Sequence, residues 1–358
     1  MSKGTTARGR VAGLAVAAFA LVAGAAGANA STSIVAYNVY PLISDSSAVT
    51  APLTDTSLVN GWGLSASATS PWWTSNNRTN TSTLYTGVGS KNALTVTVAG
   101  GPTGTVANPS TTDFAVSQGN ASGAARFLFD TQAGTILGWT PTVNGTAAVV
   151  AVDNSSKGAV YDGLAILNSR LYAADFHNAR IDSFDASWKP LSLPFSDPNI
   201  PKGWAPFNIQ ALNGNLFVTY AQQDPAKKVS VAGGGLGYVD EFTPDGTLVG
   251  RVASKGNSKA PLNAPWGLAM APADYGAYSG DLLVGNFGNG RISAYQQRSG
   301  KWVYKGQLRV ASGAPITIDG LWAIGFGNGA SSGPTNDLYF LAGPTGQSHG
   351  LFGFIAVG

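Results

Sequence analysis

The sequence predicts an all-β protein, a six-bladed β-propeller whose ring is closed by an N-terminal strand. Two sequence marks recur along the chain with a period of roughly 50 residues, which is typical of blades of four strands each. No stretch beyond residue 30 shows helical periodicity. A strand near the N-terminus has no sequence neighbour to pair with, while the last repeat lacks its final strand.

The first thirty residues have the composition of a secretory signal peptide. Lys3, Arg8 and Arg10 form a basic start, an uncharged apolar stretch follows, and Ala28-Asn29-Ala30 matches a cleavage signal. The segment is short and rich in Ala and Gly, which favours a cleaved leader over a membrane anchor. We therefore expect residues 1–30 to be removed after Ala30 and residues 31–358 to form a single propeller domain. The protein would be secreted to the extracellular space or the periplasm.

Composition argues against several classes of partner. The chain has 21 Lys and Arg against 18 Asp and Glu, and the three basic residues of the leader account for the excess. The mature chain is therefore neutral, and no charge favours binding to nucleic acid. There is no cysteine, so the fold depends on its core and has no disulfides. We expect a monomer without a membrane span in the mature chain.

The first repeated mark is a turn that leads into an apolar strand. Its copies are Gly61-Trp62-Gly63-Leu64, Asp162-Gly163-Leu164-Ala165, Pro206-Phe207-Asn208-Ile209, Pro265-Trp266-Gly267-Leu268 and Asp319-Gly320-Leu321-Trp322. The second mark is a polar residue that closes one strand, followed by an aromatic residue in the next strand. It is found as Asn76 and Tyr85, Asp130 and Trp139, Asp175 and Phe184, and Asn286 and Tyr295. Two further copies, beginning at Leu216–Tyr220 and Leu338–Ala342, carry insertions.

These marks define six repeats of four strands each. Ala93–Ala99 and Leu308–Ala311 are expected as outermost strands. The sixth repeat ends at Gly358 without a fourth strand, and the unpaired strand Ser33–Ile43 can supply it. Closing the ring in this way removes two exposed strand edges, so we assign this strand to the last blade. A β-sandwich or a β-helix fits the period of the repeat less well.

The chain also resembles a known family. The stretch Asp175-Phe-His-Asn-Ala-Arg-Ile-Asp-Ser-Phe184 and its counterpart from Asn286 are similar to NHL repeats, which carry Asp-x-x-Asn-x-Arg-Ile-x-x-Phe. Further motifs resemble those of secreted bacterial NHL-like propellers: Asn60-Gly-Trp-Gly-Leu64, Ala205-Pro-Phe-Asn-Ile209, Asp319-Gly-Leu-Trp-Ala323 and His349-Gly-Leu-Phe-Gly353. This resemblance covers essentially the whole mature chain and implies the fold, without implying a particular activity.

Propeller topology places both repeated marks on one face of the ring. Loops that lead into the innermost strands, and loops between second and third strands, open around the channel on the same side. We call this side the N-face, because the innermost strands begin there, and the other side the C-face. The ligand site expected on the N-face consists of Asn60, Trp62, Asp162, His177, Trp204, Asn208, Trp266, Asp319 and His349. The only two histidines, His177 and His349, break the repeat and are therefore better candidates than residues that recur.

Several of these residues have structural explanations as well. Asp and Asn at strand ends, such as Asp175 and Asn286, commonly cap turns by accepting hydrogen bonds from the backbone. Trp62 and Trp266 can pack at the channel mouth instead of stacking on a ligand. For Asp162, capping and ligand binding fit the pattern equally well.

Three functions are compatible with the sequence. A neutral face rich in Trp, Asn and Asp favours a small-molecule, carbohydrate or peptide ligand, so the first hypothesis is a binding module without catalysis. The second is a lactonase-like hydrolase that holds calcium or zinc through Asp162, Asp319 and His349. The chain has a single glutamate, Glu241, and no visible acidic cluster, which counts against this hydrolase. The third is a structural protein of the cell envelope.

Overall fold

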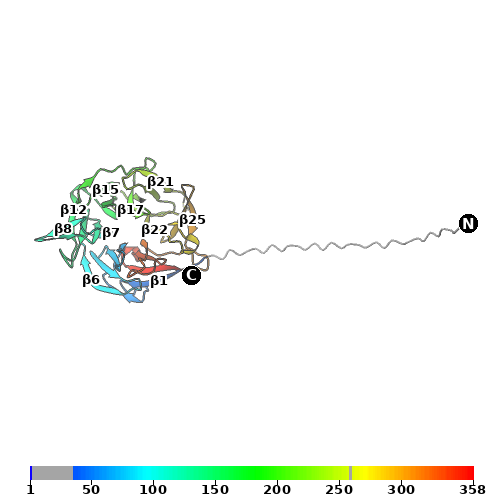
Figure 1. Ribbon diagram of the computed structural model, residues 1–358, viewed down its shortest axis with the longest axis horizontal. Coiled ribbons are helices and arrows are strands. Elements are labelled where there is room, and N and C mark those ends of the chain that lie inside the picture. The colour runs from blue at the N-terminus through cyan, green and yellow to red at the C-terminus, as the bar shows by residue number, and fades with distance from the viewer. Residues whose placement is uncertain (2–34, 258–259) are drawn as a thin grey trace. The chain divides into compact units, whose positions relative to one another are not determined.

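Six antiparallel sheets follow one another along the chain and around a central axis (Figure 1). The structure is a computed structural model, and it describes residue 1, residues 35–257 and residues 260–358. The predicted six-bladed β-propeller is confirmed. The predicted signal peptide, apart from Met1, lies outside the described residues and stays a prediction.

The first three blades take their strands in chain order, from the innermost to the outermost. Blade one contains β3 (Gly61–Ser65), β4 (Trp72–Asn76), β5 (Thr81–Tyr85) and β6 (Lys91–Thr97). Blade two contains β7 (Pro102–Ala107), β10 (Phe127–Thr131), β11 (Thr135–Trp139) and β12 (Val149–Asp153), with the hairpin β8 (Ala115–Gln118) and β9 (Ala121–Ala124) inserted after its first strand. Blade three contains β13 (Tyr161–Leu167), β14 (Arg170–Asp175), β15 (Arg180–Phe184) and β16 (Pro190–Leu191).

Blades four and five follow the same order. Blade four contains β17 (Trp204–Leu212), β18 (Asn215–Gln223), β20 (Tyr238–Phe242) and β21 (Leu248–Ala253), with the short β19 (Ser230–Val231) paired to β18. Blade five contains β22 (Pro265–Met270), β23 (Leu282–Asn286), β24 (Ile292–Arg298) and β25 (Lys301–Gln307). In the described part of the chain, three short helical turns lie in connections: η1 (Ser155–Lys157), η2 (Gly276–Tyr278) and α1 (Pro344–Gln347).

Blade six joins both ends of the propeller unit in one sheet. Its first three strands are β26 (Leu321–Phe326), β27 (Leu338–Ala342) and β28 (Leu351–Val357). The fourth strand is β1 (Tyr37–Ser44), which runs antiparallel to β28 from the pair Tyr37 and Val357 to the pair Ser44 and Leu351. A two-residue strand, β2 (Leu53–Thr54), adds to β1 in parallel. The strand expected over residues 33–43 thus begins, within the described residues, at Tyr37.

The outermost strand of blade five differs from the prediction. Leu308–Ala311 was expected, but the fourth strand is β25, which returns directly from β24. Ser299 and Gly300 have φ values of 48° and 75°, the left-handed pair that a tight hairpin turn requires. The hairpin turn thus places the fourth strand before Leu308. Leu308 itself is buried but lies outside any strand. In blade one the prediction Ala93–Ala99 is two residues late, because β6 ends at Thr97.

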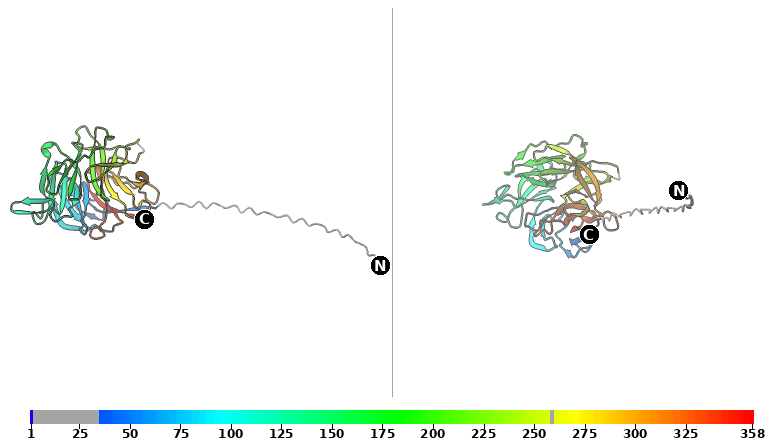
Figure 2. Two further views of the ribbon diagram at one scale, coloured as in Figure 1. Left: turned by 45° about the horizontal axis from the view of Figure 1, so that its top comes forward. Right: turned by 45° about the vertical axis from the view of Figure 1, so that its right-hand side comes forward.

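Most of the core lies between neighbouring blades, whose faces pack against each other around the ring (Figure 2). Between blades one and two, Trp73 stacks on Phe127 with ring centroids 4.1 Å apart. Near the axis the inner strands come close enough that glycine is required. A Cβ atom on Gly63 would lie 2.4 Å from the carbonyl oxygen of Thr103 in the next blade. The small residues of the repeat therefore set how closely the inner strands surround the channel.

The recurring acids and amides are structural caps. The backbone N–H of Val160 donates to Asp175 Oδ1 at 3.3 Å, and the N–H of Asn263 donates to Asn286 Oδ1 at 2.8 Å. Each bond ties the end of a second strand to the loop that leads into the first strand of the same blade. The capping interpretation of these two residues is therefore confirmed.

Candidate functional site

The channel is closed on the N-face by a group of side chains that we call the aromatic plug. Its members are Trp62, Phe176, Phe207, Trp266, Phe287 and Trp322. Trp62 stacks on Trp322 with ring centroids 3.6 Å apart, and Trp266 meets both rings edge-on. Trp62 is 3% exposed and Trp266 is 4% exposed. These two predicted site residues therefore pack on each other and present no open ring face on the N-face.

A chain of amide side chains fastens the plug. Asn60 is fully buried, and its Oδ1 atom accepts a hydrogen bond of 3.0 Å from Trp322 Nε1. Its Nδ2 atom donates to Asn77 Oδ1 at 3.2 Å and to Gln347 Oε1 at 3.1 Å. Asn77 in turn donates to Gln132 Oε1 at 3.2 Å. Asn60, a predicted ligand residue, has its hydrogen-bonding capacity used by the fold.

Three buried carboxyl groups lie where blades two and three meet: Asp130, Asp162 and Asp175. Asp130 Oδ1 accepts hydrogen bonds from Thr103 Oγ1 at 2.8 Å and from the N–H of Gly104 at 2.5 Å. Asp162 occupies the repeat position that Trp62 holds in blade one and Trp266 holds in blade five. Its backbone carbonyl oxygen accepts a hydrogen bond of 2.8 Å from Trp266 Nε1. Asp130 Oδ2 and Asp162 Oδ1 have no hydrogen-bond partner among the described residues.

Burial dominates the protonation of these acids. Burial raises the pKa of Asp130 to about 6, although the hydrogen bonds from Thr103 and Gly104 act in the opposite direction. Burial, followed by the charge of Asp130, raises the pKa of Asp162 well above its ordinary value. Burial also raises the pKa of Asp175. Because Asp162 is only 1% exposed, it forms part of the interior at this joint and does not line an open cleft.

The two histidines make contacts in different parts of the ring. His349 Nδ1 lies 2.9 Å from Asp45 Oδ2 and 3.2 Å from Ser46 Oγ, beside the strand that closes blade six. His177 is partly buried in the blade-three loop, and its Nδ1 atom has no partner among the described residues. Gln223 from blade four donates to the carbonyl oxygen of His177 at 3.2 Å. No contact in the described chain joins the two imidazoles.

The remaining N-face candidates are also separate from one another. Asp319 is exposed, and its Oδ2 atom accepts a hydrogen bond of 2.7 Å from the N–H of Thr345. Trp204 packs edge-on against Tyr238 within blade four, with ring centroids 4.8 Å apart. Within residues 35–257 and 260–358, no three His, Cys, Asp or Glu side chains come close enough to hold a metal ion. The predicted calcium or zinc set of Asp162, Asp319 and His349 is therefore wrong: one is buried at a blade joint, one is at the surface and one pairs with Asp45.

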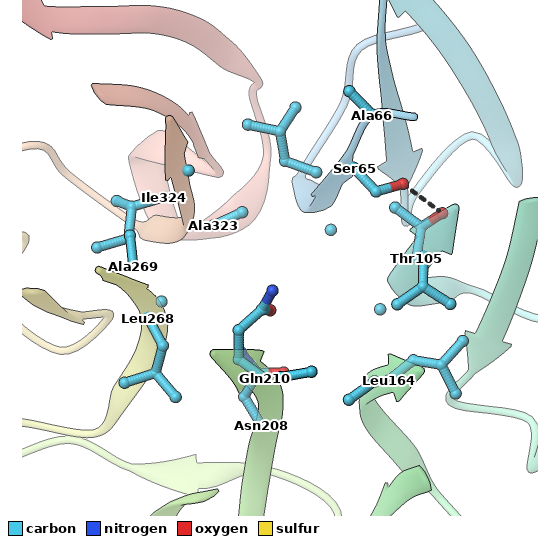
Figure 3. A pocket seen from close by; sticks show the side chains of 18 of the residues that line it. Ser65, Ala66, Thr105, Leu164, Asn208, Gln210, Leu268, Ala269, Ala323 and Ile324 are labelled. Atoms are coloured by element: carbon cyan, nitrogen blue, oxygen red, sulfur yellow. Dashed lines mark hydrogen bonds between the residues drawn. The ribbon is translucent and has the colours of Figure 1, made fainter. Parts of the chain in front are cut away.

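A cavity opens from the channel on the C-face, opposite to the predicted site. It has a volume of about 430 Å³ and is lined by the innermost strands of all six blades. Asn208 and the plug residue Trp266 lie at its inner end. The side chains that surround it are shown in Figure 3: Ser65, Ala66, Thr105, Leu164, Asn208, Gln210, Leu268, Ala269, Ala323 and Ile324. Of the described residues that line it, none carries an ionisable side chain.

The polar atoms of this cavity, which we call the channel cavity, differ in how far the protein uses them. Ser65 Oγ and Thr105 Oγ1 lie 3.3 Å apart and bond to each other. Asn208 Nδ2 donates to the carbonyl oxygen of Trp266 at 2.8 Å. The side-chain amide of Gln210 points into the open centre (Figure 3), and none of the described residues makes a hydrogen bond to it. Among the described residues that line this cavity, Gln210 thus presents an amide whose donors and acceptor are all unused.

Two residues that line the cavity, Asn208 and Trp266, belong to the site that the sequence predicts, although that site is expected on the N-face. Ser65, Thr105 and Gln210 are not among the predicted residues. The signal was present in β17, where Asn208 and Gln210 are two residues apart and so point to the same side of a strand. Polar residues at that spacing inside an innermost strand indicate that polar side chains line the channel.

Comparison of the sequence with known proteins identifies relatives but no activity. No family model matches the chain. It is 33% identical over 317 residues to the uncharacterised protein R648 of Acanthamoeba polyphaga mimivirus, a match that covers 84% of this chain and 76% of that protein. It is 32% identical over 314 residues to the uncharacterised protein L690 of the same virus, covering 84% and 80%. A third mimivirus protein, R640, is 37% identical over 220 residues, and the match spans only 40% of its length.

The similarity to solved structures extends to the fold alone. The soluble aldose sugar dehydrogenase of Escherichia coli superposes with a TM-score of 0.51 at 13% identity, over 90% of this chain and 100% of that one. The virginiamycin B lyase of Staphylococcus aureus superposes with a TM-score of 0.50 at 11% identity, over 90% and 99%. The described residues contain no helix long and apolar enough to cross a membrane. On the strength of the sequence matches, this chain belongs to the family of the uncharacterised mimivirus proteins R648 and L690.

Proposed function

We propose that the protein is a secreted small-molecule-binding propeller whose site is the channel cavity on the C-face. The observation that carries this proposal is the cavity itself: about 430 Å³, lined by every blade and closed at its inner end by the aromatic plug. Small-molecule sites are typically concave, of a few hundred Å³, mostly apolar and supplied with a few placed polar groups. Secretion rests on the signal-peptide pattern that ends at Ala30.

The chemistry of the cavity supports binding more than catalysis. No acid, base or nucleophile with a perturbed environment lines it, and Asp130 and Asp162, whose pKa values burial raises, lie behind the N-face instead. Fold neighbours include a lyase and a dehydrogenase, which are different reactions on a shared architecture. The neighbours therefore select no reaction for this chain, and the lining residues favour recognition of an uncharged molecule.

A cavity-filling variant tests this assignment. Ser65 lines the cavity and is partly exposed, so Ser65→Phe places a ring in the space and removes only the side-chain hydrogen bond of 3.3 Å to Thr105. Ser192→Phe, at an exposed position after β16, is the matched control. We expect ligand-observed NMR with a library of neutral, anionic and cationic fragments to show binding to the wild type and to Ser192→Phe, and its loss in Ser65→Phe with an unchanged circular dichroism spectrum. Fragments that bind Ser65→Phe equally well, or no fragment that binds the wild type, would overturn the proposal.

A further inference from the structure

We infer that the channel cavity selects uncharged ligands that carry a hydrogen-bond donor and acceptor side by side, such as a primary carboxamide, a lactam or a comparable ring edge. This inference rests on the proposed function and goes further by naming the ligand class. Its basis is the position of Gln210 in a cavity that offers no charge.

Charge is the first selection rule. The walls contain apolar side chains, notably Leu164, Leu268 and Ile324, and no Lys, Arg, His, Asp or Glu among the described lining residues. An ion that leaves water for such a site loses its hydration without gaining a counter-charge, which is costly. A neutral molecule loses much less. The cavity therefore discriminates against anions and cations of the same shape.

Hydrogen bonding is the second selection rule. A carboxamide presents one acceptor oxygen and an NH₂ donor on neighbouring atoms, so it pairs in two places with a ligand that carries the complementary arrangement. Other polar side chains of the lining are already engaged. Asn208 bonds to the Trp266 carbonyl oxygen, and Asn328 donates to the carbonyl oxygens of Ser67 and Ser70 at 2.8 and 2.9 Å. Gln210 remains to orient the ligand.

The opposite wall adds a weaker, adaptable contact. Ser65 and Thr105 bond to each other at 3.3 Å, and a hydroxyl group has two lone pairs besides its proton. The pair can therefore accept a hydrogen bond from a ligand while keeping its own. Each innermost strand also stands at the end of its sheet, so peptide groups along its free edge face the channel. All these groups are neutral, in agreement with the first rule.

Three molecules of similar shape distinguish selection by charge from selection by hydrogen bonding. Benzamide is neutral with an adjacent donor and acceptor, benzoate is an anion with acceptors only, and benzamidinium is a cation with donors only. We expect titrations monitored by ligand-observed NMR at neutral pH to show that the wild type binds benzamide at least about tenfold more tightly than either ion, since one unmatched charge or lost hydrogen-bond pair is worth that factor or more.

Substitution of Gln210 makes the test specific. Gln210→Leu keeps the size of the side chain and removes its polar atoms, so benzamide should bind about tenfold more weakly. Gln210→Glu is isosteric and supplies a carboxylate, so the preference should change to benzamidinium, which pairs with it at two points. Ser192→Phe serves again as the control that leaves all three affinities unchanged.

The outcomes distinguish this inference from the proposal on which it rests. If benzamide binds, is excluded by Ser65→Phe, and yet is matched in affinity by benzoate or benzamidinium, the cavity is a site and the ligand class is wrong. The inference also falls if Gln210→Leu binds benzamide as well as the wild type does. If none of the three molecules binds and the fragment library also fails, the cavity itself is not the site.

Discussion

Trp62 and Trp322 stack with ring centroids 3.6 Å apart, although they come from the first and the last blade of the propeller. The contact joins blade one to blade six, the blade that β1 completes. Asn60, two residues before Trp62, accepts the indole hydrogen bond of Trp322, so stacking and hydrogen bonding hold the same joint. The plug therefore links the closure of the ring to the closure of the channel.

Removal of one plug ring should be costly. Trp62→Ala removes a fully packed indole that touches Phe207, Trp266 and Trp322, and loss of a buried aromatic side chain costs about 3–5 kcal/mol. Urea unfolding followed by fluorescence measures the change. Val88→Ala, at a side chain that is 78% exposed, should stay within about 0.5 kcal/mol of the wild type. A Trp62→Ala variant as stable as the Val88→Ala control would contradict the role given to the plug.

Asp130 should make the protein more stable in mild acid. Its pKa is 3.8 ordinarily and about 6 in the folded chain, so between these values the folded state holds a proton that the unfolded state has lost. Stability is therefore greatest below pH 3.8 for this group, and about 3 kcal/mol is lost as the pH rises through 6. Asp130→Asn keeps the acceptor for Gly104 and cannot ionise. We expect the variant to gain stability over the wild type at about pH 8 and to match it near pH 4, measured as urea midpoints. A constant difference between the two across this range would contradict the prediction.

Asp55 should show the opposite pH dependence. Burial alone would raise its pKa, but hydrogen bonds from Lys91 Nζ at 2.7 Å and Tyr85 OH at 2.6 Å outweigh burial, and the pKa is lowered. Its stabilisation is present above the ordinary value of 3.8 and is lost as the pH falls through the lowered pKa. Asp55→Asn should cost about 2 kcal/mol at neutral pH and less in acid. Asp274→Asn, at an exposed position, is the control, and equal effects of both changes at neutral pH would count against this clamp.

The strand β1 should be needed for a closed ring. A chain that begins at residue 45 loses the whole pairing with β28 and the hydrogen bond of 3.0 Å from Tyr37 OH to the Tyr275 carbonyl oxygen. Compared with a chain that begins at residue 35, we expect a melting temperature lower by at least about 5 °C. A synthetic peptide of residues 35–44 should restore part of the loss, because the exposed edge of β28 remains a template. Equal melting curves of the two chains would contradict this dependence.

The N-face residues should be dispensable for binding in the channel cavity. Asp319 bonds to Thr345 and His349 pairs with Asp45, and neither lines the cavity. The double variant Asp319→Ala and His349→Ala should bind benzamide as the wild type does, in contrast to Gln210→Leu. Loss of benzamide binding in the double variant, with an intact circular dichroism spectrum, would return the site to the N-face.

The blade architecture could be predicted because it depends on local patterns that repeat. Asp175 and Asn286 each cap the end of a second strand through a local hydrogen bond, so the same pattern recurs from blade to blade. The inner strands need a small residue at Gly63 and Gly267, because the backbone of the next blade approaches closely there. The missing fourth strand of the last blade also followed from counting strands in the sequence.

The candidate site could not be predicted because it depends on which side chains of different blades come into contact in the folded ring. Trp62 and Trp266 look alike whether they form an open mouth or a closed plug, and only their distance to Trp322 decides. In the sequence, capping and ligand binding fit Asp162 equally well, and only the structure places it at the joint of two blades, where burial raises its pKa. Once the N-face is filled by side chains, the free space of the channel remains on the C-face, around Gln210.

The pairing of β1 with β28 also determines how the ring responds to force. Tyr37, at the start of β1, lies opposite Val357, at the end of β28, so the two ends of the propeller unit leave the sheet side by side. Tension applied through these ends loads the hydrogen bonds between β1 and β28 one after another instead of all at once. We therefore expect β1 to separate from β28 residue pair by residue pair, so that the ring opens at blade six while the sheets of the other five blades stay intact.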